Sequence, residues 1–547
     1  MGPRGRTGVV PVHVCEVLLP PPVTGQTMQL GYHAALALIA TASLSLPGFA
    51  AEPDGPASLI ARTESVRIAV EDRLQARFSP SSARKAEQDA LVKYYAVSDQ
   101  ALLWVDENGI TQRGNAIIAE IKQADDYGLR ASDYALPNPN GFNAYDTKAN
   151  DWLADTEIKI SYAVLDYARD ARGGRIDPQH LSENLDPTLA LPDPTEVIQS
   201  IASRTDPAMY LRSFQPDQPQ FEALRRKLME LRGSDRNSKK TAANNGKIGA
   251  ILVNMERWRW LPNDLGPYYV NVNVPEFMLR VVDEGKVIHT ARVVVGKRDK
   301  QTPIFSNEMQ EVVFNPVWNV PTSIKTEEIL PWVNSGGGFF GGGYSTAIFE
   351  RHNLHIKYGG REVDPRSIDW GRVDIRNMEI YQPPGPGNVL GHVKFVFPNK
   401  HDVYMHDTTE KNYYGQPYRA ESHGCMRVQN PDQLAFVLLK HDQGWTEARV
   451  ASAIRGSGDN HIGLQQKIPV YISYFTLRVN DDGSISTFGD VYGHDARMAA
   501  ALSRKSEALD GPTKSKDIAA GQVKSSVKRS RQGGASINDF ARTRFGF

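Results

Sequence analysis

One cysteine stands where it could do covalent chemistry. The 547 residues contain two cysteines, and the second, Cys425, lies in the stretch Ser-His-Gly-Cys-Met-Arg at 422–427. Two cysteines do not make a disulfide framework, so bridging does not explain this thiol. An isolated cysteine can also be a small buried hydrophobe. The neighbours of Cys425 favour a nucleophile instead.

A cysteine nucleophile requires a base, a low thiol pKa and hydrogen-bond donors for the developing oxyanion. His406 ends an expected strand, with Tyr404 on the same face two residues earlier, and a fifteen-residue loop follows before Ser422. A neighbouring imidazolium lowers a thiol pKa from about 8.5. We therefore predict that His406 is the base and that the Cys425 thiol titrates well below about 8.5.

The residues around the cysteine predict an oxyanion hole and a positive surface. Gly424 permits backbone conformations in which successive N–H groups point at one spot, so the N–H groups of Gly424 and Cys425 are the expected donors. Arg427 adds positive charge and could hold a carboxylate. His423 is given a supporting role. Ser422, like Tyr404, is a candidate for lining the substrate pocket.

Two other cysteine chemistries fit less well. The two histidines and Cys425 could ligate zinc, but no fourth ligand is evident, so we predict no metal site. Papain-like proteases have the cysteine before the histidine in the chain, whereas here His406 comes first.

The N-terminus predicts export. Residues 34–51 form an apolar run that ends in small residues, which is typical of a secretory signal within a leader spanning 1–51, cleaved near Ala50 or Ala51. Met28 is the expected true start. Cys15 precedes the signal, so the exported chain would carry Cys425 as its only thiol. We expect a periplasmic protein, and an uncleaved signal would instead hold it at the inner membrane.

Composition indicates an ordinary globular chain. Lys+Arg and Asp+Glu balance at 63 each, hydrophobic residues make up 40%, and nothing argues for a nucleic-acid partner. The length after the signal predicts two to four domains, on the order of 150 residues each. The segment 504–547 is basic and lacks apolar periodicity, so it is expected to be a disordered tail.

The chain changes its hydrophobic period along its length. Residues 60–232 are predicted to be mostly helical, with Phe221, Leu224 and Leu228 on one helical stripe. The segment 233–265 is expected to hold a polar linker, 232–246, and a helix from Ile248 to Trp260.

From about residue 266 the period becomes two. Val270, Val272 and Val274 alternate with asparagines, and a hairpin is expected to turn at Glu284-Gly285. A β-rich domain therefore spans 266–490. It contains an insertion at 318–382 with two glycine triplets, which we expect to be a flexible loop or lid because no Lys-Ser/Thr follows them.

The pattern from His406 to Arg427 resembles the signature of the L,D-transpeptidases, which cross-link bacterial peptidoglycan. The resemblance covers roughly 266–480, and the segment 60–260 is similar to the scaffold region of the large Gram-negative members. It implies an α+β protein, with a helical scaffold region followed by a β-rich catalytic domain that carries a capping insertion. Such members often insert a peptidoglycan-binding module where only the linker 232–246 stands here.

The resemblance also implies a reaction. Cys425 would attack a donor tetrapeptide stem and release D-Ala, and the side-chain amine of another stem's diaminopimelate would resolve the thioester as a 3→3 cross-link. The main-chain carbonyl of Asp407 would orient His406. Peptidoglycan stem peptides are the expected partners, carbapenems are expected to acylate Cys425, and no cofactor is required. Water or a protein lysine could replace the acceptor, and a non-enzymatic wall-binding role stays open.

Overall fold

The computed structural model describes residues 56–76, 82–97, 101–233, 238–335 and 344–504. The predicted signal, Cys15, the glycine triplets and nearly all of the basic tail lie outside these ranges. No helix in the described part of the chain is both long and apolar enough to cross a membrane.

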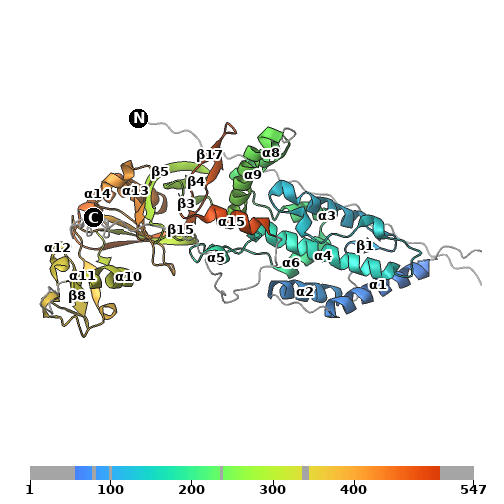
Figure 1. Ribbon diagram of the computed structural model, residues 1–547, viewed down its shortest axis with the longest axis horizontal. Coiled ribbons are helices and arrows are strands. Elements are labelled where there is room, and N and C mark those ends of the chain that lie inside the picture. The colour runs from blue at the N-terminus through green and yellow to red at the C-terminus, as the bar shows by residue number, and fades with distance from the viewer. Residues whose placement is uncertain (1–55, 77–81, 98–100, 234–237, 336–343, 505–547) are drawn as a thin grey trace, which may run out of the picture. The chain divides into compact units, whose positions relative to one another are not determined.

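The N-terminal region is helical, as predicted, and is built around one long helix. Helix α4, Ala149–Gly173, buries most of its length. The others in this region are α1 (Pro56–Ala76), α2 (Ser82–Tyr95), α3 (Gln112–Lys122), α5 (Pro178–Leu181), α6 (Pro194–Ser203), α7 (Pro207–Arg212) and α8 (Pro219–Gly233). Helices α5, α6 and α7 each begin at an Asp-Pro pair, in which the aspartate accepts N–H groups of the first turn and proline supplies a helical φ. Figure 1 shows α1 and α2 beside α4.

Helix α9, Ser238–Trp258, begins earlier than predicted. The stretch expected to be a polar linker is therefore largely helical, from Ser238 onward. Its lysines and alanines have high helix propensity and it contains no proline, so it extends a helix whose later turns are buried. The apolar stripe of α8 is confirmed, since Phe221, Leu224 and Leu228 are buried against α9.

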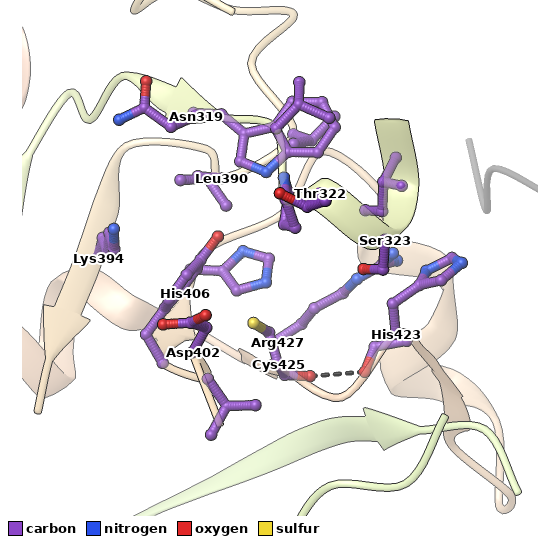
Figure 2. Close-up of a pocket in the computed structure, with 18 of the residues that line it drawn as sticks. Asn319, Thr322, Ser323, Leu390, Lys394, Asp402, His406, His423, Cys425 and Arg427 are labelled. Atoms are coloured by element: carbon purple, nitrogen blue, oxygen red, sulfur yellow. Dashed lines mark hydrogen bonds between the residues drawn. The ribbon is translucent and has the colours of Figure 1, made fainter. Parts of the chain in front are cut away.

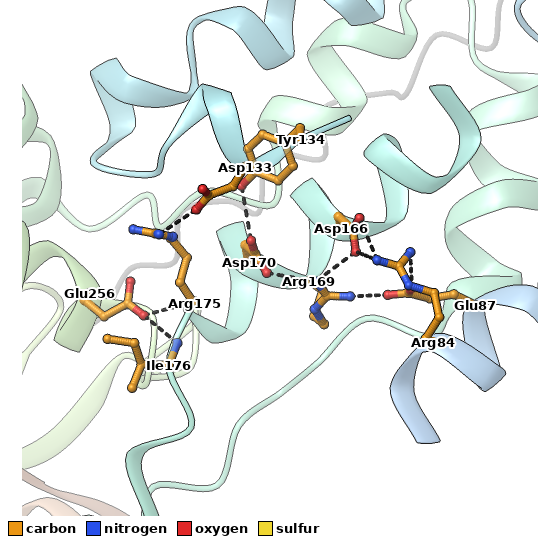
Figure 3. Close-up of polar contacts among 10 residues, drawn as sticks. All are labelled: Arg84, Glu87, Asp133, Tyr134, Asp166, Arg169, Asp170, Arg175, Ile176 and Glu256. Atoms are coloured by element: carbon orange, nitrogen blue, oxygen red, sulfur yellow. Dashed lines mark hydrogen bonds and ion pairs between the residues drawn. The ribbon is translucent and has the colours of Figure 1, made fainter. Parts of the chain in front are cut away.

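Buried charges hold the helical region together (Figure 3). Arg169 of α4 pairs with Glu87 of α2, and it lies 2.9 Å from Asp166 and 3.2 Å from Asp170. Glu256 of α9 accepts hydrogen bonds from the main-chain N–H groups of Arg175 and Ile176, just after α4. These contacts stabilise the packing of α2, α4 and α9, because an unpaired charge at these buried positions would be costly.

Nine strands of the described chain form one sheet in the β-rich domain, in the order β13-β5-β14-β12-β11-β6-β15-β3-β4. A further pairing of β4 with β5 closes the sheet into a barrel-like shape. The strands are β3 (Tyr268–Asn273), β4 (Met278–Asp283), β5 (Lys286–Gly296), β6 (Ser306–Phe314), β11 (Val393–Val396), β12 (Met405–His406), β13 (Ala420–Ser422), β14 (Met426–Val428) and β15 (Asn460–Ser473). The α+β class is thus confirmed.

The predicted alternation and hairpin are present. Val270, Val272 and Val274 are fully buried inside the barrel. Glu284 and Gly285 both have positive φ, 46° and 73°, which is the turn that matches the twist of a two-residue hairpin. Helices α13 (Pro431–Gln443), α14 (Glu447–Arg455) and α15 (His494–Ser503) contribute further buried residues to the barrel core.

The insertion is a small folded unit and not merely a flexible loop. Four of its described strands form a separate sheet in the order β7-β10-β8-β9. Its elements are β7 (Trp318–Asn319), α10 (Thr322–Ile324), η4 (Lys325–Ile329), α11 (Leu330–Asn334), α12 (Ala347–Arg351), β8 (His355–Tyr358), β9 (Arg361–Glu362) and β10 (Glu379–Gln382). These elements share a core of their own around Phe349 and Trp370. We call residues 318–382 the cap.

Candidate active site

Cys425 lies in a tight turn between β13 and β14. Gly424 has a φ of +114°, a conformation that L side chains rarely adopt, which explains the glycine. The Ser422 hydroxyl donates to the Cys425 carbonyl at 2.5 Å and accepts the Gly424 N–H at 3.2 Å. The buried Thr302 hydroxyl donates to the Gly424 carbonyl at 2.7 Å. Side chains from two segments therefore fix the turn that presents the thiol.

The sheet brings His406 to the same place. Strand β12 pairs in parallel with β14, with His406 opposite Arg427. Figure 2 shows the His406 ring and the Cys425 sulfur pointing toward each other. Both residues line a cavity of about 660 Å³, together with cap residues from Trp318 to Ile324. The predicted base and nucleophile thus share one cavity beneath the cap.

Burial sets the protonation state of His406. It lowers the pKa of the ring to about 3, and the nearby charges of Arg427 and Lys394 act in the same direction. The main chain of Asp407 acts to raise it. The contact between the Asp407 main chain and the His406 ring is not a hydrogen bond, because the buried Nδ1 atom has no partner with hydrogen-bond geometry among the described residues. The imidazole is therefore neutral at pH 7.

The thiol pKa corrects a prediction. Burial raises the pKa of Cys425 above its usual value, although hydrogen bonding from Tyr404 and the charges of Lys394 and Arg427 oppose this. The expected low thiol pKa required an imidazolium, and a neutral His406 supplies no such charge. In the resting site a thiol therefore faces a neutral imidazole, an arrangement suited to deprotonation as the sulfur attacks.

The proposed oxyanion donors also change. The Gly424 N–H already donates to Ser422 within the turn, so it is not free to bind an oxyanion. The Cys425 N–H makes no hydrogen bond to any residue the structure describes. Of the two predicted donors, only the Cys425 N–H remains available. Ser422 lines the cavity, and its hydroxyl also stabilises the turn.

Three predicted residues are held by partners that the sequence did not indicate. Arg427 donates to Glu410 at 2.5 Å, and the carboxylate-binding role stays a prediction. His423 lies 2.8 Å from Glu328 of the cap. The Asp407 carboxylate pairs with Lys411 and accepts the His392 N–H.

Tyr404 is closer to the chemistry than predicted. Its hydroxyl and main chain both lie near enough to the thiol to oppose the rise in the Cys425 pKa, and its ring packs against the cap core. The residue thus connects the nucleophile to the cap.

Several site residues were missed from the sequence. Lys394, Thr302 and Glu328 are distant from the motif in the chain. Lys394 lies on β11, which pairs with β12, and no local pattern in the sequence indicated that pairing. Among the described residues, no group of three His, Cys, Asp or Glu side chains is arranged to hold a metal ion.

Comparison with known proteins finds two family models that match separate parts of the chain. Residues 267–443 match the family model described as the L,D-transpeptidase catalytic domain. Residues 89–228 match a model described as a Scaffold domain, which corresponds to the helical region. The residues that match the catalytic-domain model therefore include Cys425, His406 and the strands of the closed sheet next to them.

Individual proteins are similar to parts of this chain. The chain is 30% identical over 251 residues to a Haemophilus influenzae protein named "Putative L,D-transpeptidase". The match covers 46% of this chain and 49% of that protein, so this chain spans about half the length of the relative. A solved structure titled "Structure of the Ldtfm-avibactam carbamoyl enzyme" is similar at 11% identity, over 42% of this chain and 62% of that one, with a TM-score of 0.18. At that score the likeness carries no structural argument.

Proposed function

We propose that this protein is a peptidoglycan L,D-transpeptidase that forms 3→3 cross-links through a cysteine thioester. The observation that carries the proposal is the cavity in which the Cys425 sulfur and the His406 ring face each other beneath the cap (Figure 2). A neutral base beside a half-buried thiol is suited to acyl transfer.

In the first step the Cys425 sulfur attacks the carbonyl carbon between the L-centre of diaminopimelate and the terminal D-Ala. His406 takes the thiol proton, and the Cys425 N–H donates to the oxyanion. The C–N bond then breaks, the leaving amine takes the proton from His406, and free D-Ala departs. A thioester remains on Cys425. No cofactor or metal enters this step.

In the second step the side-chain amine of another stem's diaminopimelate attacks the thioester carbon. His406 accepts a proton from this amine and returns it to the sulfur. The products are an amide cross-link and the free thiol. Water in place of the amine would give an L,D-carboxypeptidase, and a protein lysine would attach a protein to the wall.

The test uses tetrapeptide stems and mass spectrometry of the products. We expect the wild-type protein to release D-Ala and to form dimers, and Cys425→Ala to do neither. Tripeptides without dimers would point to a carboxypeptidase. Retention of the cellular phenotype by Cys425→Ala would favour a non-enzymatic role in wall binding.

The substrate requires an exported enzyme. The apolar run at 34–51 supports secretion to the periplasm, and a stem peptide would be available there. Cell fractionation, with and without residues 34–51, tests this location.

A further inference from the structure

Lys394 presents an ammonium group to the catalytic cavity. It lies on β11 between the buried Val393 and Phe395, so its side chain projects from the opposite face of the strand. In the sheet register it stands directly across from His406. Cross-strand partners have neighbouring side chains, and Lys394 lines the same cavity as Cys425 (Figure 2).

This ammonium lacks a direct anionic partner, although the charges of Asp459 and Glu311 act on it from beyond ion-pair distance. Among the described residues no carboxylate lies within ion-pair distance of it, and its Nζ atom rests 4.1 Å from the centroid of the Tyr404 ring. Three other basic residues that line the cavity do have a carboxylate partner: Arg427 contacts Glu410, His423 contacts Glu328, and His401 contacts Asp186. A half-buried cation without a counter-ion is unfavourable, and burial indeed lowers the Lys394 pKa.

We propose that Lys394 binds the carboxylate of the amino acid that leaves when Cys425 is acylated. This inference rests on the proposed function, in which the attacked carbonyl is followed by a single residue. In such a peptide one nitrogen and one α-carbon separate the scissile carbonyl from the terminal carboxylate, a span of roughly 4 Å. Lys394 stands across from His406 in the sheet and lines the same cavity as Cys425, and its charge acts on both groups.

The contact would couple binding to catalysis. The uncompensated Lys394 charge helps to lower the pKa of His406. A bound carboxylate would offset that charge, and the imidazole would become a stronger base when a peptide with a free C-terminus is in place. Departure of the amino acid removes the carboxylate before the acceptor arrives. Lys394 is thus a substrate-binding residue that selects donors ending one residue after the scissile bond.

The experiment compares a tetrapeptide stem with its C-terminal carboxamide. Release of D-Ala or D-alaninamide is measured for the wild type and for Lys394→Met, Lys394→Arg and Lys440→Ala, the last altering an exposed lysine of α13. We expect the wild type to prefer the acid at least about tenfold in kcat/KM, equivalent to ~1.4 kcal/mol. Lys394→Met should abolish this preference by slowing only the acid, whereas Lys394→Arg and Lys440→Ala should retain it.

A second readout does not require turnover. In a Cys425→Ser background, calorimetry measures the affinity for both peptides with and without Lys394→Met. Acid-selective binding that depends on Lys394 supports the inference even if the wild type forms no cross-links, a failure that would concern only the proposed function. A preference for the acid that persists in Lys394→Met overturns the inference. The inference is also overturned if Lys394→Met changes the response to amidation of the diaminopimelate side-chain carboxylate and not the response to amidation of the terminal carboxylate.

Discussion

The Nε2 atom of His423 lies 2.8 Å from the Oε1 atom of Glu328. This pair joins the turn that holds the nucleophile to helix η4 of the cap. Both side chains are largely shielded from solvent, which makes the contact stronger than a surface ion pair.

We expect Glu328→Gln to lower kcat/KM for the donor peptide by about three- to tenfold, because the cap loses a charge-assisted contact with the turn. Glu350→Gln, on the exposed surface of the cap, is the matched control. A double-mutant cycle with His423→Asn measures the coupling. Additive effects of the two substitutions would show that the pair does not link cap and turn.

The thiol should titrate at high pH. Burial raises the Cys425 pKa and lowers that of His406. An ordinary thiol has a pKa of about 8.5, so the rate of Cys425 alkylation by iodoacetamide should still increase with pH above that value. His406→Ala should leave the midpoint almost unchanged, since a neutral ring stabilises no thiolate. A plateau below pH 7 that His406→Ala removes would instead reveal a preformed ion pair.

Acylation by a carbapenem should depend on Thr302. The Thr302 hydroxyl donates to the Gly424 carbonyl and accepts the Gly296 N–H at 2.9 Å. Thr302→Val keeps the shape but removes both bonds, so we expect adduct formation on Cys425 to slow by about tenfold, from a loss of ~1.4 kcal/mol. Intact-mass spectra over time give the rate, with Thr290→Val on the exposed part of β5 as control. An unchanged rate would mean that Ser422 alone fixes the turn.

The helical region should depend on one buried carboxylate. Glu157 of α4 accepts the N–H groups of Leu103, Trp104 and Val105 at 2.5, 2.9 and 3.1 Å and the Tyr95 hydroxyl at 2.6 Å. In Glu157→Gln an amide N–H₂ group replaces one accepting oxygen, which should destabilise this region by about 2–3 kcal/mol.

Thermal unfolding followed by circular dichroism measures this effect. The exposed Glu196→Gln serves as its control and should unfold like the wild type. Equal melting temperatures for Glu157→Gln and the wild type would show that the four hydrogen bonds contribute little.

Local patterns were sufficient for much of the fold. The valines of β3 alternate because one face of that strand enters the core, and Glu284-Gly285 turns because both residues adopt positive φ. The helix at 238–246 was missed because it has no apolar stripe, and its stability comes from the later turns of α9.

The site was only partly predictable for a different reason. The motif around Cys425 is local, whereas the partners of its side chains come from the cap and from other strands. Sequence could not show that Glu410 neutralises Arg427, or that Ser422 occupies the Gly424 N–H. The sequence also could not show that the His406 imidazole is neutral, because its burial depends on all the residues that pack around it.

The parallel pairing of β12 with β14 has a consequence for inhibitors. Cys425 directly precedes β14, and His406 ends the adjacent strand β12 of one closed sheet. Their spacing is therefore set by the main chain, while the cap over them is a separate folded unit with its own core. Differences in ligand preference among related enzymes should therefore arise in the cap residues that line the cavity. Compounds that contact these cap residues could discriminate between enzymes that share the same cysteine and histidine.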